Sequence, residues 1–298
     1  MNLFLNLCFA VKMLNQVHNE KKGCIMTDYH VHIGQFKNAY YYADRVFSVL
    51  KKNGVDEAYF SSTTSCVFCK ESADERFSEH ERKNAPSASS LYEAIREEVK
   101  NALLSAKEIG IKAHALYWVV PDFHLADLGI TVKKVMEDIP YDGFKIHPFS
   151  QKWNFKDERI LELAEEIFEY AEKYKKRILI HTGVSESDEP HQFEKWFSDF
   201  PNVKVCLAHC KDSAPIIELF SRYKNLYGDT AFCPKDSFDA ICKAGFKDRM
   251  LFGTDFPVTP PHWYEHCGEK KISADLNSLT ESYARTLKSF AQYFPKYV

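Results

Sequence analysis

Short apolar segments alternate with amphipathic helical segments along most of the chain, and this alternation limits the possible folds more than any other feature. The apolar segments lie at residues 28–34, 55–60, 112–120, 141–148, 177–183, 203–209, 226–229 and 250–257. Strands that alternate with helices form parallel β-α-β units. Eight such units in a chain of 298 residues match the size of a (β/α)8 barrel. An open doubly wound sheet is the alternative, but no glycine-rich phosphate loop follows the first segment. We therefore predict an α/β fold of the distorted (β/α)8 TIM-barrel type.

The segments between these strands have helical periodicity. They predict helices at 38–53, 90–109, 131–138, 157–175, 190–199, 213–223, 236–244 and 274–293. Residues 1–25 include an apolar run that is too short to span a bilayer and has no basic region before it. Since Met26 directly precedes the first strand, we expect 1–25 to be a non-catalytic extension and 26–298 to form a single barrel domain.

Charge and cysteine content limit the functional classes. The formal net charge is -3 and no long basic run is present, which argues against a nucleic-acid surface. No other stretch is long and apolar enough for a transmembrane helix, so no membrane partner is expected. The nine cysteines have no framework spacing, which favours free thiols and a cytoplasmic location.

Polar residues concentrate where the predicted strands end. They are His30 and His32 in the first strand, Lys145 and His147 in the fourth, and His181, His209, Asp229 and Asp255 in the fifth to eighth. In a parallel barrel these ends share one rim, where barrel enzymes place their active sites. Alternation puts His30 and His32 on one face of their strand. Imidazoles and carboxylates are typical zinc ligands, so the pattern predicts a metal site at the C-terminal rim.

Several of these residues have a second possible role. A lone buried histidine is more often a hydrogen-bonded core residue than a ligand, so the prediction depends on the whole set. Asp229 is a candidate substrate contact or a helix N-cap. His147 is a candidate substrate contact or a group behind the ligands. Asp28 is either a partner of a ligand histidine or a plain strand-start residue.

Five motifs occur in a characteristic order: Asp28-Tyr29-His30-Val31-His32, Gly143-Phe144-Lys145-Ile146-His147-Pro148, Ile180-His181-Thr182-Gly183, Leu207-Ala208-His209-Cys210 and Phe252-Gly253-Thr254-Asp255-Phe256-Pro257. Together they resemble the amidohydrolase superfamily, in particular its amidohydrolase-2 branch, which includes aminocarboxymuconate-semialdehyde decarboxylase. The resemblance covers about residues 26–294, nearly the whole chain.

The resemblance implies roles for individual residues. His30, His32, His181 and Asp255 would hold one divalent metal ion, with zinc expected first and manganese or iron as alternatives. Three imidazoles and a carboxylate leave a coordination position open, as catalytic zinc requires. Asp255 would orient and deprotonate the metal-activated water, and His209 would act on the substrate or on that water. A second metal bound through a carbamylated Lys145 is the alternative to an unmodified Lys145 that positions a substrate carboxylate or a neighbouring side chain.

The resemblance therefore predicts a metal-dependent hydrolase that acts on an amide, ester or lactone of a small organic substrate. A non-oxidative decarboxylase of a small carboxylated substrate is the nearest alternative, because it would use the same ligands. A phosphoesterase or nuclease and a catalytically silent barrel rank below these two. The sequence leaves the oligomeric state open, with a homodimer as one option.

Overall fold

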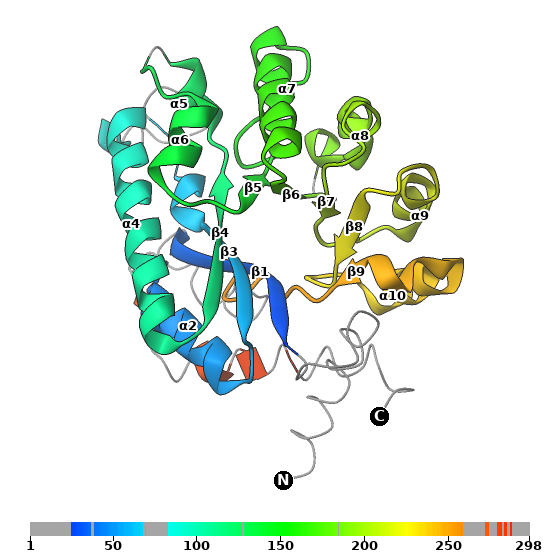
Figure 1. Ribbon diagram of the computed structural model, residues 1–298, viewed down its shortest axis with the longest axis horizontal. Helices are drawn as coiled ribbons and strands as arrows, with labels where there is room; N and C mark the ends of the chain where they lie inside the picture. The colour runs from blue at the N-terminus through cyan, green and yellow to red at the C-terminus, as the bar shows by residue number, and fades with distance from the viewer. Residues whose placement is uncertain are drawn as a thin grey trace.

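The computed structural model describes residues 25–36, 39–67, 69, 83–126, 128–183, 185–258, 272–273, 279–281, 283–284 and 287. Within these ranges, eight strands run parallel, each paired with the next one along the chain. They are β1 (Thr27–Phe36), β3 (Glu57–Ser62), β4 (Lys112–Trp118), β5 (Gly143–Ile146), β6 (Arg177–Ile180), β7 (Val205–Leu207), β8 (Leu226–Asp229) and β9 (Met250–Leu251). The sheet curls with its helices on the outside (Figure 1). The prediction of a distorted (β/α)8 barrel is confirmed.

The barrel closes between β1 and the segment that follows β9. Backbone bonds of 2.8, 2.8 and 2.7 Å run from Tyr29 N to Phe252 O, from Asp255 N to His30 O, and from His32 N to Phe256 O. The last strand therefore lies beside the first, and the polar ends of both strands meet.

A buried carboxylate reinforces this closure from inside. Asp28 accepts hydrogen bonds from the Thr254 amide at 3.1 Å and the Thr254 hydroxyl at 2.7 Å, and a third from the Tyr283 hydroxyl at 3.3 Å. It also accepts one from the His30 amide at 3.2 Å. Asp28 is completely buried, so these bonds replace the water that burial removes. Two of these four hydrogen bonds come from Thr254 in the loop after β9, and among the described histidines only the backbone of His30 donates one.

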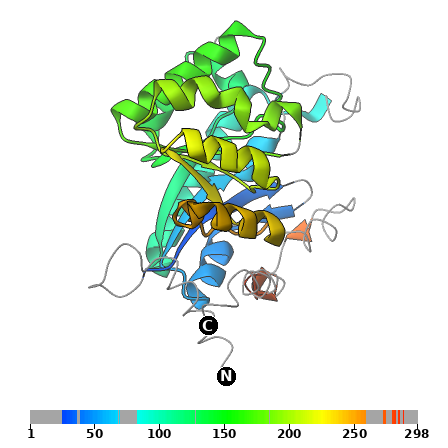
Figure 2. The same cartoon turned by 90° about the vertical axis from the view of Figure 1, so that its right-hand side faces the viewer.

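Amphipathic helices cover the outer face of the sheet. They are α2 (Ala43–Lys52), α4 (Ala88–Ile109), α5 (Pro121–Leu125), α6 (Val132–Asp138), α7 (Glu158–Lys173), α8 (Glu194–Asp199), α9 (Ser213–Arg222) and α10 (Lys235–Ile241). Figure 2 shows the later helices, coloured green to orange, side by side on one flank. Helix α7 illustrates the cause: Asp157 caps its first turn, and its buried residues recur every three or four positions and join the main core.

The helix predicted at 38–53 is wrong in its first part. Ala39–Tyr41 forms a strand, β2, antiparallel to the end of β1, and helix α2 begins only at Ala43. Ala39 and Tyr41 are buried while Tyr40 is half-buried, which is the period of a strand. The Tyr40 hydroxyl donates to Glu98 of α4 at 2.6 Å. Pairing with the long first strand therefore outweighs local helical periodicity.

Two other predictions lie largely outside the described residues. These are the extension, of which only residue 25 is described, and the helix at 274–293, of which only six residues are described, all of them helical. No helix in the described part of the chain has the length and apolar character needed to cross a membrane.

Gly34 sits at a crowded point of β1. Its φ is +90°, and an added Cβ would lie 2.4 Å from a Glu98 carboxylate oxygen and 2.5 Å from the Thr64 hydroxyl. Gly54 also has a positive φ, +82°, but nothing lies within 4 Å of its added Cβ. A substitution at Gly54 therefore tests backbone strain alone, whereas a substitution at Gly34 tests backbone strain and steric crowding together.

We expect Gly54→Ala to lower the free energy of unfolding by about 1–2 kcal/mol, the cost of a left-handed alanine. Gly34→Ala should cost roughly 3 kcal/mol or more, because it also displaces the hydrogen-bonded Glu98 carboxylate. Urea denaturation of both variants measures the difference. Equal losses of unfolding free energy in the two variants would show that the Glu98 contact does not constrain this part of β1.

Candidate metal centre

Two histidines of β1 converge on an aspartate that follows β9. The Nε2 atoms of His30 and His32 lie 3.1 and 2.8 Å from the same Asp255 oxygen. All three side chains are buried, and their donor atoms lie within 4.8 Å of one another. Asp255 has a left-handed backbone, with φ of +59°, which directs its carboxylate back toward the histidines. Barrel closure thus brings together three side chains with possible metal-donor atoms, two from β1 and one from the segment after β9.

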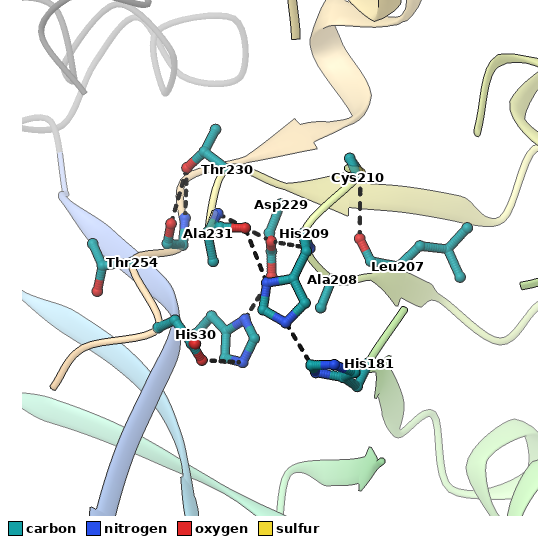
Figure 3. Close-up of polar contacts among 12 residues, drawn as sticks. His30, His181, Leu207, Ala208, His209, Cys210, Asp229, Thr230, Ala231 and Thr254 are labelled. Carbon is teal, nitrogen blue, oxygen red and sulfur yellow. Dashed lines mark hydrogen bonds and ion pairs between the residues drawn. The ribbon is translucent and has the colours of Figure 1, made fainter. Parts of the chain in front are cut away.

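The ring of His30 is oriented by Asp229, at the end of β8. Its Nδ1 lies 2.8 Å from one Asp229 oxygen, while the other oxygen accepts bonds from the amides of His209 and Ala231 (Figure 3). An Nδ1–H that donates to a carboxylate leaves the Nε2 lone pair available for a metal. His32 Nδ1 lies 3.1 Å from the Ser61 hydroxyl and 3.4 Å from the Ser61 carbonyl oxygen, and the carbonyl, which can only accept, favours a proton on Nδ1.

Asp229 is completely buried, and both its oxygens bond protein atoms. Helix α10 has Pro234 as its N-cap, so the alternative of Asp229 as a helix N-cap is wrong. Burial raises the pKa of Asp229, and the bond from the His209 amide opposes that shift. These contacts direct Asp229 toward His30 and away from solvent.

Lys145 of β5 is buried beside the same group. Its Nζ lies 3.0 Å from His30 Nε2 and 5.7 Å from the centre of the Trp118 ring. Burial lowers the pKa of this lysine, and the nearby carboxylates of Asp255 and Asp229 oppose the shift. An ammonium at this position can neutralise an anionic group that enters the rim.

His209 and His181 form a second pair of imidazoles. The His209 Nδ1 bonds the carbonyl of Ala231 at 3.0 Å, so it carries the proton. Its Nε2 must then accept from His181 Nδ1, at 2.9 Å (Figure 3). The remaining nitrogen of His181, Nε2, is a buried lone pair with no hydrogen-bond partner among the described residues.

Burial favours the neutral form of His30, His181 and His209. Burial lowers the pKa of His30 and His181 far below the usual histidine value, and repulsion from Lys145 and from neighbouring imidazoles adds to it. For His209, burial lowers the pKa to about 4. Metal ligation requires deprotonated donors. Neutral imidazoles, a carboxylate and an unpartnered buried lone pair therefore fit a divalent metal.

The remaining rim residues lie on the far side of His181. The rings of His147 and His181 stack at 3.6 Å, and Trp118 stacks on His147 at 5.3 Å. Asp188, from the loop after β6, has its carboxylate within 4.8 Å of the donor atoms of both histidines. The sequence prediction missed Asp188, because nothing in its local sequence distinguishes it from the neighbouring acids Glu186 and Glu189.

The predicted site residues thus gather at one rim in three groups of candidate donors, one of which, His30, His209 and Asp229, overlaps the first. His30, His32 and Asp255 form the first group, which Lys145 and Asp229 contact. His181 belongs to a second group with His147 and Asp188, and His209 lies between the two.

The Asp229 contact leads to a test. In Asp229→Asn the amide group would donate toward His30 Nδ1, which moves the ring proton to Nε2 and blocks the metal-binding lone pair. Loss of such a supporting partner lowers metal affinity roughly 10–100-fold. Titration of metal-free protein with Zn²⁺ measures this, and Asp239→Asn, which changes an exposed carboxylate paired with Lys235, is the control. Unchanged affinity in Asp229→Asn would contradict the positioning role.

Known proteins resemble this chain in family and in fold. The family model described as amidohydrolase matches residues 118–284. A crystal structure described as amidohydrolase II has a TM-score of 0.50 at 13% identity, over 88% of this chain and 99% of that one. A TatD-like protein from Archaeoglobus fulgidus also has a TM-score of 0.50, at 12% identity, over 88% of this chain and 99% of that one. These two likenesses concern the fold alone, and no curated protein sequence matches. Since the family match covers more than half of its length, the chain belongs to the amidohydrolase family.

Proposed function

We propose that the protein is a metal-dependent hydrolase that cleaves an amide, ester or lactone of a small organic substrate. The observation that supports this best is the convergence of His30 Nε2, His32 Nε2 and an Asp255 oxygen at the C-terminal rim. Barrel enzymes carry out their chemistry at this rim. The family match supports an enzyme of this superfamily.

His30, His32 and Asp255 would hold one divalent metal ion, with His181 as the fourth ligand on the pattern of the family. Zinc is the first candidate, and manganese and iron suit the same donors. When bound, such an ion polarises a substrate oxygen and lowers the pKa of water.

The chain's own residues complete the reaction. The Asp255 carboxylate lies at the rim to take a proton from the attacking water. His209 stands between the two groups, with Nδ1 fixed on the Ala231 carbonyl. Its Nε2 accepts from His181 Nδ1 at 2.9 Å, and this nitrogen would exchange a proton with the substrate once that bond opens. The Lys145 ammonium would stabilise negative charge on the substrate. We assign Asp229 to the orientation of His30 rather than to substrate binding, and His147 to the pocket wall beside His181.

Lys145 also supports a second candidate function, that of a non-oxidative decarboxylase. A buried ammonium 3.0 Å from His30 Nε2 can pair with the carboxylate of a substrate, which a non-oxidative decarboxylase requires. Such an enzyme would use the same donor group and release carbon dioxide.

The metal requirement is tested with ligand variants. His32→Gln and Asp255→Asn should lower metal affinity by more than the roughly 100-fold typical of supporting residues, because each removes a donor atom. Elemental analysis of the purified proteins measures the bound metal. His114→Gln, at the opposite end of the barrel and paired with Asp142, should keep the wild-type content. Full metal content in both ligand variants would rule out this donor group.

The two reactions differ in their products. We expect the metal-loaded protein to incorporate ¹⁸O from labelled water into the product of an amide, ester or lactone, as mass spectrometry detects. Carbon dioxide release from carboxylated ring compounds without ¹⁸O incorporation would favour the decarboxylase. Turnover that persists after full metal removal would contradict both.

A further inference from the structure

Phe232 occupies a backbone position that glycine normally fills. The Cys233 amide donates to the Thr230 carbonyl at 3.2 Å, so residues 230–233 form a tight turn directly after β8. Phe232 is the third residue of this turn, and its φ is +53°. A positive φ at this position favours glycine or asparagine, because a Cβ strains the backbone there. A bulky aromatic residue in this conformation is an outlier, and such outliers concentrate at functional sites.

The backbone of the turn is fixed by the site itself. The Ala231 amide donates to an Asp229 oxygen at 3.1 Å, and the Ala231 carbonyl accepts from His209 Nδ1 at 3.0 Å. The other Asp229 oxygen orients the ring of His30. The turn therefore cannot relax to a less strained backbone without disturbing both histidines, and the strain at Phe232 persists.

These bonds explain the turn but not the phenyl ring. All of them use backbone atoms of the turn, which a glycine at position 232 would supply as well. The Phe232 ring is 37% exposed and belongs to neither of the two apolar core clusters in the described part of the chain. Its centre lies 5.6 Å from that of the His209 ring, at an interplanar angle of 75°. His209 itself is only 2% exposed, so the phenyl ring is the accessible member of the pair.

We propose that Phe232 determines substrate specificity by packing its ring against an apolar, ring-sized group of the substrate. This inference rests on the proposed function, in which His209 exchanges a proton with the substrate. A group bonded to the reacting carbon would lie close to His209 and hence close to Phe232. Contact with such a group would remove the exposed phenyl ring from water, and an edge-to-face or offset arrangement of two rings adds to the attraction.

Binding of two neutral amides, benzamide and acetamide, to Zn²⁺-loaded protein tests this role. Neither probe is charged, so an ion pair with Lys145 does not contribute to the difference between them. Wild type should bind benzamide at least about tenfold more tightly than acetamide, as titration of the ligand's NMR signals measures. Phe232→Gly should lower this preference roughly tenfold, because it removes the ring while suiting the backbone of the turn. A variant that merely folds less well would weaken both amides equally and leave the preference unchanged.

Three more variants sharpen the test. Phe232→Asn also tolerates a left-handed backbone and should repeat the loss, so it carries the test if Phe232→Gly does not fold. Phe232→Tyr keeps the ring and should keep the preference. Tyr174→Ala is the matched control, because it removes an exposed ring at the C-terminal end of α7, away from the rim, and should leave the preference unchanged.

The outcomes for Phe232 and for the proposed function are separable, because equilibrium binding needs no turnover. Equal affinity of wild type for the two amides, or an undiminished preference in Phe232→Gly, would overturn the role of Phe232 and leave the metal-dependent reaction untouched. Preferential binding of benzamide without hydrolysis of any amide, ester or lactone would instead count against the hydrolase and still support the contact with Phe232.

Discussion

Closure of the barrel between β1 and the segment after β9 is the constraint on which the rest of the structure depends. Three backbone hydrogen bonds join residues 29–32 to residues 252–256 across the whole length of the domain. The buried Asp28 carboxylate adds side-chain bonds from Thr254 and Tyr283. Because Asp255 lies within this seam, the contacts that close the barrel also place its carboxylate against His30 and His32. Stability and site assembly therefore share one set of interactions.

Buried carboxylates then determine what each imidazole can do. Asp229 accepts a hydrogen bond from His30 Nδ1–H with one oxygen and from the His209 amide with the other, so a single side chain sets the geometry of two histidines. Asp188 accepts from the Phe149 amide with one oxygen, and its other oxygen has no hydrogen-bond partner in the described part of the chain.

Much of the fold and part of the site could be predicted, because both depend on local patterns. Apolar segments that alternate with amphipathic helices indicated the barrel, and polar residues at strand ends indicated its functional rim. Where the prediction failed, a distant partner decided the outcome. Residues 39–41 form a strand because they pair with the end of β1 and because Glu98 accepts from Tyr40. Asp188 was missed because its importance comes from a loop-to-loop contact that leaves no mark on the sequence around it.

The sequence by itself determined the strand order, the face of β1 that carries His30 and His32, and the rim at which the polar residues meet, since strand periodicity and parallel β-α-β connection are local rules. Only the tertiary structure decided the grouping of these residues: Asp255 with the β1 histidines, Asp229 behind His30, and His181 beside His147 and Asp188. The physical reason is that donor distances and ring protonation depend on hydrogen bonds between segments far apart in the chain. Those bonds exist only once the barrel has closed.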